Sequence, residues 1–140
     1  MKLNKTKLKE LADDVTTGLR VYLNPNTLEH KCILFDDMDE VHEAYEDEME
    51  KVQSWDKSIE IESMDSNRLY RAMENFAYIV KDSHLQDKLL TILKLRSPIH
   101  NFKEIIKSSN ERENWYKYIL NLEMEFIRSQ LEIEDIEMEE

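Results

Sequence analysis

The second half of the chain places hydrophobic residues at helical spacing, between polar residues that can cap helices. Apolar positions recur three and four residues apart in four successive stretches, as in amphipathic helices. Asp65, Ser83, Ser97 and Ser108 precede these stretches, and Ser83 and Ser108 open sequences that fit a capping box. The pattern predicts four helices with these apolar faces: Leu69, Ala72, Met73, Phe76, Ile79 and Val80; Leu85, Leu89, Ile92 and Leu93; Ile99, Phe102, Ile105 and Ile106; and Trp115, Ile119, Leu122 and Phe126.

The first 35 residues combine one short helical pattern with two strand patterns. Apolar residues at helical spacing over 8–15 predict a helix, and Gly18 follows as its C-terminal stop. Two strand-like segments, 19–23 and 28–35, flank the sequence Asn-Pro-Asn-Thr at 24–27. These four residues favour a turn, so the segment is predicted to be a β-hairpin.

A further strand is needed because a two-stranded hairpin is only marginally stable alone. Residues 58–62 alternate between polar and apolar and are the predicted third strand. The resulting fold class is α+β, with a small antiparallel sheet near the N-terminus packed against a mainly helical body of five to six helices. Residues 1–131 are predicted to form one domain, and 132–140 an acidic, disordered tail.

The negative charge of the chain is concentrated in two blocks. The net charge is −12, yet residues 36–66 alone hold thirteen Asp and Glu against two Lys, and residues 129–140 add six acids. Met38, Val41, Tyr45, Met49 and Val52 fall at helical spacing in the first block, which predicts one helix with an acidic outer face. Such blocks influence the choice of partner and not the fold. The acids of this face are the candidate interaction surface: Asp39, Glu40, Glu43, Glu46, Asp47 and Glu50.

Composition excludes several classes of function. Gly18 is the only glycine, and phosphate-binding loops of the P-loop or dinucleotide type need several. One cysteine, Cys32, rules out an intrachain disulfide. No run of apolar residues is long enough for a transmembrane helix, and the basic N-terminal residues lack the apolar region of a signal peptide. The acidic balance argues against binding to nucleic acids or anionic membranes. The predicted location is the cytoplasm.

Several short sequences resemble those of one protein family. They are Ser66-Asn67-Arg68-Leu69-Tyr70-Arg71-Ala72-Met73-Glu74-Asn75-Phe76, Pro98-Ile99-His100-Asn101-Phe102-Lys103 and Trp115-Tyr116, with Tyr22-Leu23-Asn24 in the hairpin. In these the chain is similar to the bacterial uncharacterised protein family 0158. Two residues differ from the family pattern. After the threonine of the hairpin, the family usually has glycine where this chain has Leu28, and it usually has phenylalanine where this chain has Ile99. The resemblance implies an uncharacterised bacterial protein and supplies no activity or catalytic residues.

Two pairs of side chains are candidates for chemistry. His30 and Cys32 stand two residues apart on a predicted strand and therefore share a face. A nucleophilic thiol would need a base and a third group that orients the base, so a buried, inert thiol is the favoured interpretation. His42 and Glu46 fall on one face of the predicted acidic helix, but two ligands do not make a metal site. We therefore predict no catalytic residues, no metal and no cofactor.

These observations favour a small protein-interaction or regulatory module without catalytic activity. Its partner would be a protein with a basic surface, which the acidic helix would attract. Two alternatives stay open: a nucleic-acid mimic that binds a basic protein through spaced carboxylates, and an enzyme of unrecognised type. Self-association into a homo-oligomer is also left open.

Overall fold

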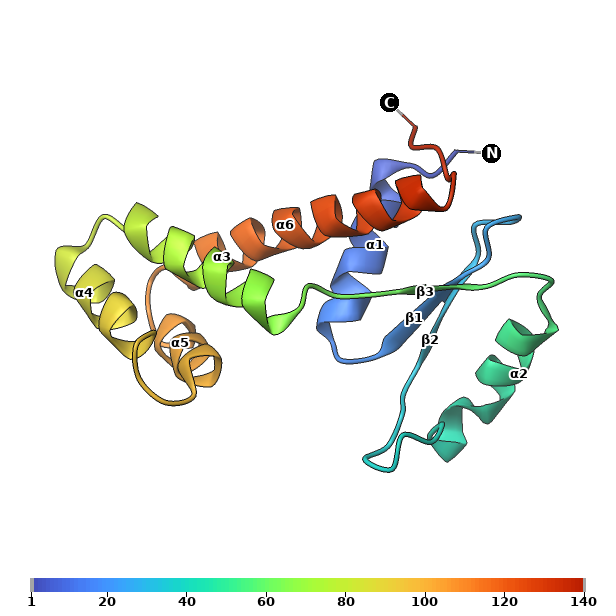
Figure 1. Cartoon of the computed structure of the whole chain (residues 1–140), viewed down its shortest axis with the longest axis horizontal. Coiled ribbons are helices and arrows are strands. Elements are labelled where there is room, and N and C mark those ends of the chain that lie inside the picture. Colours follow the sequence, from blue (N-terminus) through green and yellow to red (C-terminus); the bar gives the residue numbers. More distant parts are fainter. Residues whose placement is uncertain (1, 140) are drawn as a thin grey trace. The chain divides into compact units, whose positions relative to one another are not determined.

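The structure, a computed structural model, describes residues 2–139. These residues form two compact units. Unit 1 contains the residues up to Ser63 together with those from Glu123 onward, and unit 2 contains Met64–Leu122. A three-stranded antiparallel sheet near the N-terminus and six α-helices in the described residues confirm the α+β class (Figure 1). The boundary of a single domain at residue 131 stays a prediction.

Unit 1 contains the predicted hairpin, its third strand and the first helix. The elements are α1 (Lys5–Thr16), β1 (Arg20–Leu23), β2 (His30–Ile33) and β3 (Ile59–Ile61). The strands have the order β2-β1-β3, and both neighbouring pairs are antiparallel. Gly18 follows α1 with a φ of +90°, the backbone conformation that lets a chain leave a helix and turn. The hairpin and the third strand are confirmed.

Two helices of unit 1 lie against opposite faces of this sheet (Figure 1). Alternate residues of a strand point to opposite faces, so His30 and Cys32 face α1 while Lys31 faces α2 (Glu46–Ser54). The ammonium nitrogen of Lys31 lies 3.1 Å from a carboxylate oxygen of Glu48 in α2. The sheet is therefore covered on both sides.

The acidic segment differs from its prediction. A single helix was expected over 38–52, but α2 begins only at Glu46, after one turn of 3-10 helix, η1 (Glu43–Tyr45). The residues before η1 form a loop that a bridge between Phe35 and Val41 closes. Met38, expected on the buried stripe, is 80% exposed. The predicted helix is thus wrong in its first half.

Side-chain hydrogen bonds explain why this loop replaces a helix. The Asp36 carboxylate accepts hydrogen bonds from the backbone N–H groups of Met38 (2.9 Å) and Glu40 (3.0 Å). An aspartate that satisfies the backbone in this way competes with helical hydrogen bonding. Asp39 adopts a φ of +60°, a left-handed conformation that aspartate tolerates better than most residues. The local chemistry of these acids outweighs the spacing of the apolar residues.

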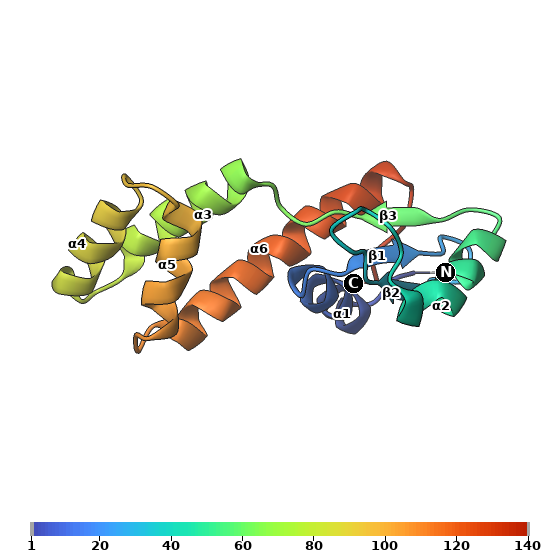
Figure 2. The same cartoon turned by 90° about the horizontal axis from the view of Figure 1, so that it is seen from below.

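Unit 2 is built on three helices and the first half of a fourth. They are α3 (Ser66–Ile79), α4 (Ser83–Ile92), α5 (Pro98–Lys107) and α6 (Arg112–Ile133), whose second half belongs to unit 1. Helices α3, α4 and α5 contact one another pairwise (Figure 2). Their buried core follows the predicted faces, except that Ile79 is exposed. The core consists of Met73, Phe76, Ala77, Val80, Leu89, Leu93, Phe102, Ile106 and Trp115.

The capping residues agree with the sequence for α3 but not for α4. The Asp65 carboxylate accepts a hydrogen bond from the backbone N–H of Arg68 at 2.8 Å, as predicted. At α4 the cap is Asp82 and not Ser83, because the Asp82 carboxylate accepts from the N–H groups of His84 (3.0 Å) and Leu85 (3.2 Å). Ser83 is the first residue of the helix itself.

Replacing Asp82 by alanine should therefore destabilise the protein by about 1 kcal/mol, the usual cost of losing an N-cap. The matched change Ser83→Ala should cost less than about 0.5 kcal/mol, since that side chain does not cap the helix. Urea denaturation followed by circular dichroism would measure both. A larger loss for Ser83→Ala than for Asp82→Ala would show that the cap is misplaced.

The C-terminal acidic segment has defined contacts in the part that the structure describes. The backbone N–H of Leu3 donates to the carbonyl of Glu137 (2.9 Å), and that of Glu139 donates to the carbonyl of Leu3 (2.7 Å). Ile136 is buried. The disorder expected of residues 132–140 stays a prediction: the contacts of the described part, up to residue 139, favour an ordered course there, and residue 140 lies outside the described residues.

Candidate functional site

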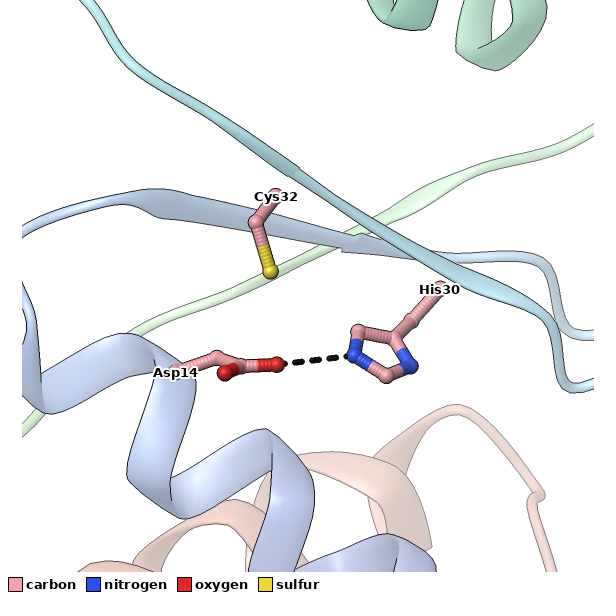
Figure 3. A group of neighbouring side chains, drawn as sticks. All are labelled: Asp14, His30 and Cys32. Carbon is pink, nitrogen blue, oxygen red and sulfur yellow. Dashed lines mark hydrogen bonds and ion pairs between the residues drawn. The ribbon is translucent and has the colours of Figure 1, made fainter.

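Three side chains that can bind metals or protons gather between α1 and β2. His30 and Cys32 project from β2 toward α1, and Asp14 on α1 points back at them (Figure 3). The shared face of His30 and Cys32 follows from the alternation of a strand, as predicted. Asp14 was not predicted, because its position beside them depends on how α1 packs on the sheet.

The three side chains are close and partly shielded from water. His30 Nε2 lies 2.8 Å from a carboxylate oxygen of Asp14. One donor atom from each residue, a nitrogen, a sulfur and an oxygen, lies within 4.8 Å of the other two. The His30 side chain is 14% exposed and that of Asp14 35%, while Cys32 is half-buried. The cluster therefore has the size of a small binding site that opens partly to solvent.

The electrostatics of the cluster keep the thiol protonated. Burial raises the pKa of Cys32 to about 12, and a hydrogen bond with Asp14 and the negative charge of Asp14 act in the same direction. The nearby charge of Lys7 opposes this rise. A nucleophilic cysteine needs the reverse, a lowered pKa or a base that takes its proton. Here Asp14 is a hydrogen-bond partner of both the thiol and the His30 ring.

The second nitrogen of the His30 ring has no partner. Nδ1 is buried and makes no hydrogen bond to any residue of the described chain. The ring is thus oriented through Nε2 and Asp14 alone. Because a carboxylate can only accept, the hydrogen bond to Asp14 places the proton of the neutral ring on Nε2 and leaves Nδ1 as an unpaired acceptor.

The predicted acidic surface lies on the loop after β2, on η1 and on α2, and all of its side chains are exposed. Asp39 forms an ion pair with the guanidinium of Arg20. Within residues 2–139 no ion pair neutralises the other members, which are Glu40, Glu43, Glu46, Asp47 and Glu50. Whether this surface binds a partner stays a prediction.

Other charged groups of this region have internal roles. A hydrogen bond from Lys31 lowers the pKa of the Glu48 carboxyl, so Glu48 ties α2 to the sheet. His42 caps η1, because its Nδ1 accepts from the backbone N–H of Ala44 at 3.1 Å. His42 thus lies before α2 and does not share a helical face with Glu46, contrary to the predicted geometry.

In unit 2, ionisable side chains line an open groove beside α4 and α5. Among them are Asp82, His84, Lys88 and Glu104. Asp82 is already engaged as the cap of α4. The groove keeps the alternative of an enzyme open without naming a reaction.

Comparison with known proteins identifies the family. None of the helices in residues 2–139 combines the length and the hydropathy that crossing a membrane requires. No curated protein and no solved structure matches the chain. The sequence model described as "Uncharacterised protein family (UPF0158)" matches residues 8–139, a span that includes Asp14, His30, Cys32 and the acidic surface. The match covers nearly the whole sequence, and the chain therefore belongs to the Uncharacterised protein family (UPF0158).

Proposed function

We propose that this protein is a non-catalytic interaction module whose acidic surface binds a partner protein with a basic surface. The observation that carries this proposal is that most of these acidic side chains form no ion pair with a basic residue of the described chain. Five of the six acidic side chains are exposed and make no ion pair within the described residues. Glu48, by contrast, is paired with Lys31 and holds α2 on the sheet.

Electrostatics favour a basic partner over other classes of ligand. Like charges one helical turn apart, such as Glu46 and Glu50 in α2, repel each other and cost a few tenths of a kcal/mol. A cationic partner surface relieves this repulsion and steers association, whereas the phosphates of nucleic acids and of anionic lipids increase it. The single cysteine, kept as a thiol, fits a reducing compartment, so we place this interaction in the cytoplasm.

Reversal of three surface charges tests this function. The variant E43K/E46K/E50K should weaken binding of a partner at least tenfold near 0.05 M salt. At this salt concentration the attraction between each of these carboxylates and the basic partner is screened only weakly, so its loss has a large effect. The partner is first crosslinked to the full-length chain, identified and purified, and its affinity is then measured by titration calorimetry. The affinity of the unaltered protein should fall as the salt concentration rises to about 0.5 M.

A second variant with the same net charge separates this surface from the charge of the whole protein. Glu74, Glu104 and Glu125 are exposed and make no ion pair in the described part of the chain. Their joint replacement by lysine should leave the affinity within about twofold of the original. Equal weakening by both triple variants, or no weakening by either, would refute the proposed role of the acidic surface.

A further inference from the structure

We propose that Asp14, His30 and Cys32 bind a divalent transition-metal ion, with Zn²⁺ as the best match. Each residue supplies one ligand, and a fourth position is left for water or another small ligand. This site lies on the α1 side of the sheet, whereas the acidic surface lies on the loop after β2 and on the α2 side. The proposal does not depend on the proposed function.

The chemistry of the three donors selects the metal. A thiolate, an imidazole and a carboxylate together are typical ligands of zinc and of neighbouring transition metals. Ca²⁺ and Mg²⁺ require oxygen ligands almost exclusively and do not fit a set with sulfur and nitrogen. Cysteine and aspartate each contribute one negative charge when they bind, which balances the two positive charges of the ion. A neutral complex suits a site as shielded as the one around His30.

The geometry requires only small side-chain movements. In a tetrahedral zinc site the ligand atoms stand about 3.3–3.6 Å apart, as the bond lengths imply. The nitrogen of His30 and the oxygen of Asp14 would separate slightly from 2.8 Å, and the most distant pair would approach by about 1 Å from the limit of 4.8 Å. Pairing of β2 with β1 fixes the backbone at His30 and Cys32. The required changes are therefore side-chain rotations.

One proton leaves the cluster as the ion enters, and a second one changes its position on the His30 ring. The ion replaces the thiol proton of Cys32, which passes to solvent, and the sulfur binds as a thiolate. It also displaces the proton of Nε2, which passes through solvent to Nδ1 of the same ring, so the thiol proton is the one released. Nδ1 has no partner among the described residues in either tautomer, so the shift of the proton leaves the number of unpaired ring atoms unchanged.

Cobalt binding tests the site directly. Cys32 is the only cysteine of the chain, so a thiolate-to-cobalt charge-transfer band in the near ultraviolet reports this residue alone. Full-length protein freed of metal with EDTA should develop the band on titration with Co²⁺ and saturate at one ion per chain. Addition of Zn²⁺ should abolish the band, because zinc binds such sites more tightly than cobalt. Absence of the band in the unaltered protein would overturn the proposal.

Variants assign the ligands. Cys32→Ser should eliminate the band, and Asp14→Asn and His30→Gln should each weaken Co²⁺ binding at least tenfold. The control is His100→Gln, an exposed histidine of α5 in unit 2, which should leave binding unchanged. Circular dichroism verifies that each variant folds. Undiminished binding by folded Asp14→Asn and His30→Gln would also overturn the proposal, since cysteine would then bind the ion without this cluster.

Discussion

Replacement of Trp115 by alanine is expected to destabilise unit 2 by about 3–5 kcal/mol, the usual cost of truncating a buried tryptophan. The ring is 4% exposed and lies at the centre of the core. Its centroid stands 5.3 Å from that of Phe76 and 5.1 Å from that of Phe102, both in edge-to-face contact. Such aromatic pairs add about 0.5–1.5 kcal/mol each beyond the area that they bury. The variant loses both pairs and leaves a cavity.

Two neighbouring changes control for this effect. Tyr116 follows Trp115 but is 49% exposed, so Tyr116→Ala should cost less than about 1 kcal/mol. Trp115→Phe keeps an aromatic ring and should cost less than Trp115→Ala. Urea denaturation followed by far-ultraviolet circular dichroism measures all three, and amide hydrogen exchange should quicken in α3 and α5 of Trp115→Ala. A loss no larger than that of Tyr116→Ala would contradict the assigned core.

The helices of unit 2 were predictable because local pattern and tertiary packing agree there. The predicted apolar stripes supply most of the buried core, with Ile79 as the exposed exception, and Asp65 caps α3 as predicted. Phe76, Phe102 and Trp115 were all expected in the core and all lie there. The shift of the α4 cap from Ser83 to Asp82 is a local ambiguity, since both residues can accept hydrogen bonds from the helix start.

The acidic segment was predicted less well because two local signals conflict. The spacing from Met38 to Val52 fits a helix, but Asp36 offers the backbone an alternative set of hydrogen bonds. Leu28 shows the same limit in the hairpin. It adopts a φ of +62°, the left-handed region that favours glycine, which is the residue expected there from the family resemblance. A periodic pattern does not reveal such backbone conformations.

Two of the three residues of the Asp14–His30–Cys32 cluster followed from the sequence. Strand alternation placed His30 and Cys32 on one face, but no local pattern links Asp14 to them across sixteen and eighteen positions. Glu123 was missed for a similar reason. It is 3% exposed and accepts a hydrogen bond from Ser63 Oγ at 2.7 Å, a contact between residues far apart in sequence. Polar groups that are buried through tertiary contacts are the least visible in a single sequence.

The thiol of Cys32, in protein kept metal-free with EDTA, is expected to react with iodoacetamide roughly 50-fold more slowly at pH 8 than the same thiol in urea-unfolded protein. The fold raises its pKa from 9.0 to about 12, chiefly by burial. At pH 8, below both values, the thiolate fraction then falls about a thousandfold. A thiolate with a higher pKa is intrinsically more nucleophilic and recovers about 20-fold of this loss. The rate of alkylation, followed by mass spectrometry, measures the net slowing that is left.

Asp14 supplies part of this protection, and its replacement separates charge from burial. Asp14→Asn removes the negative charge that opposes the thiolate, so alkylation of Cys32 should become several-fold faster. The rate should stay below that of the unfolded chain because burial, the largest cause, persists. Asp13→Asn removes the same charge from an exposed neighbour and should leave the rate unchanged. Equal rates for Asp14→Asn and Asp13→Asn would show that Asp14 does not act on the thiol, and equal rates for folded and unfolded protein would show that burial does not either.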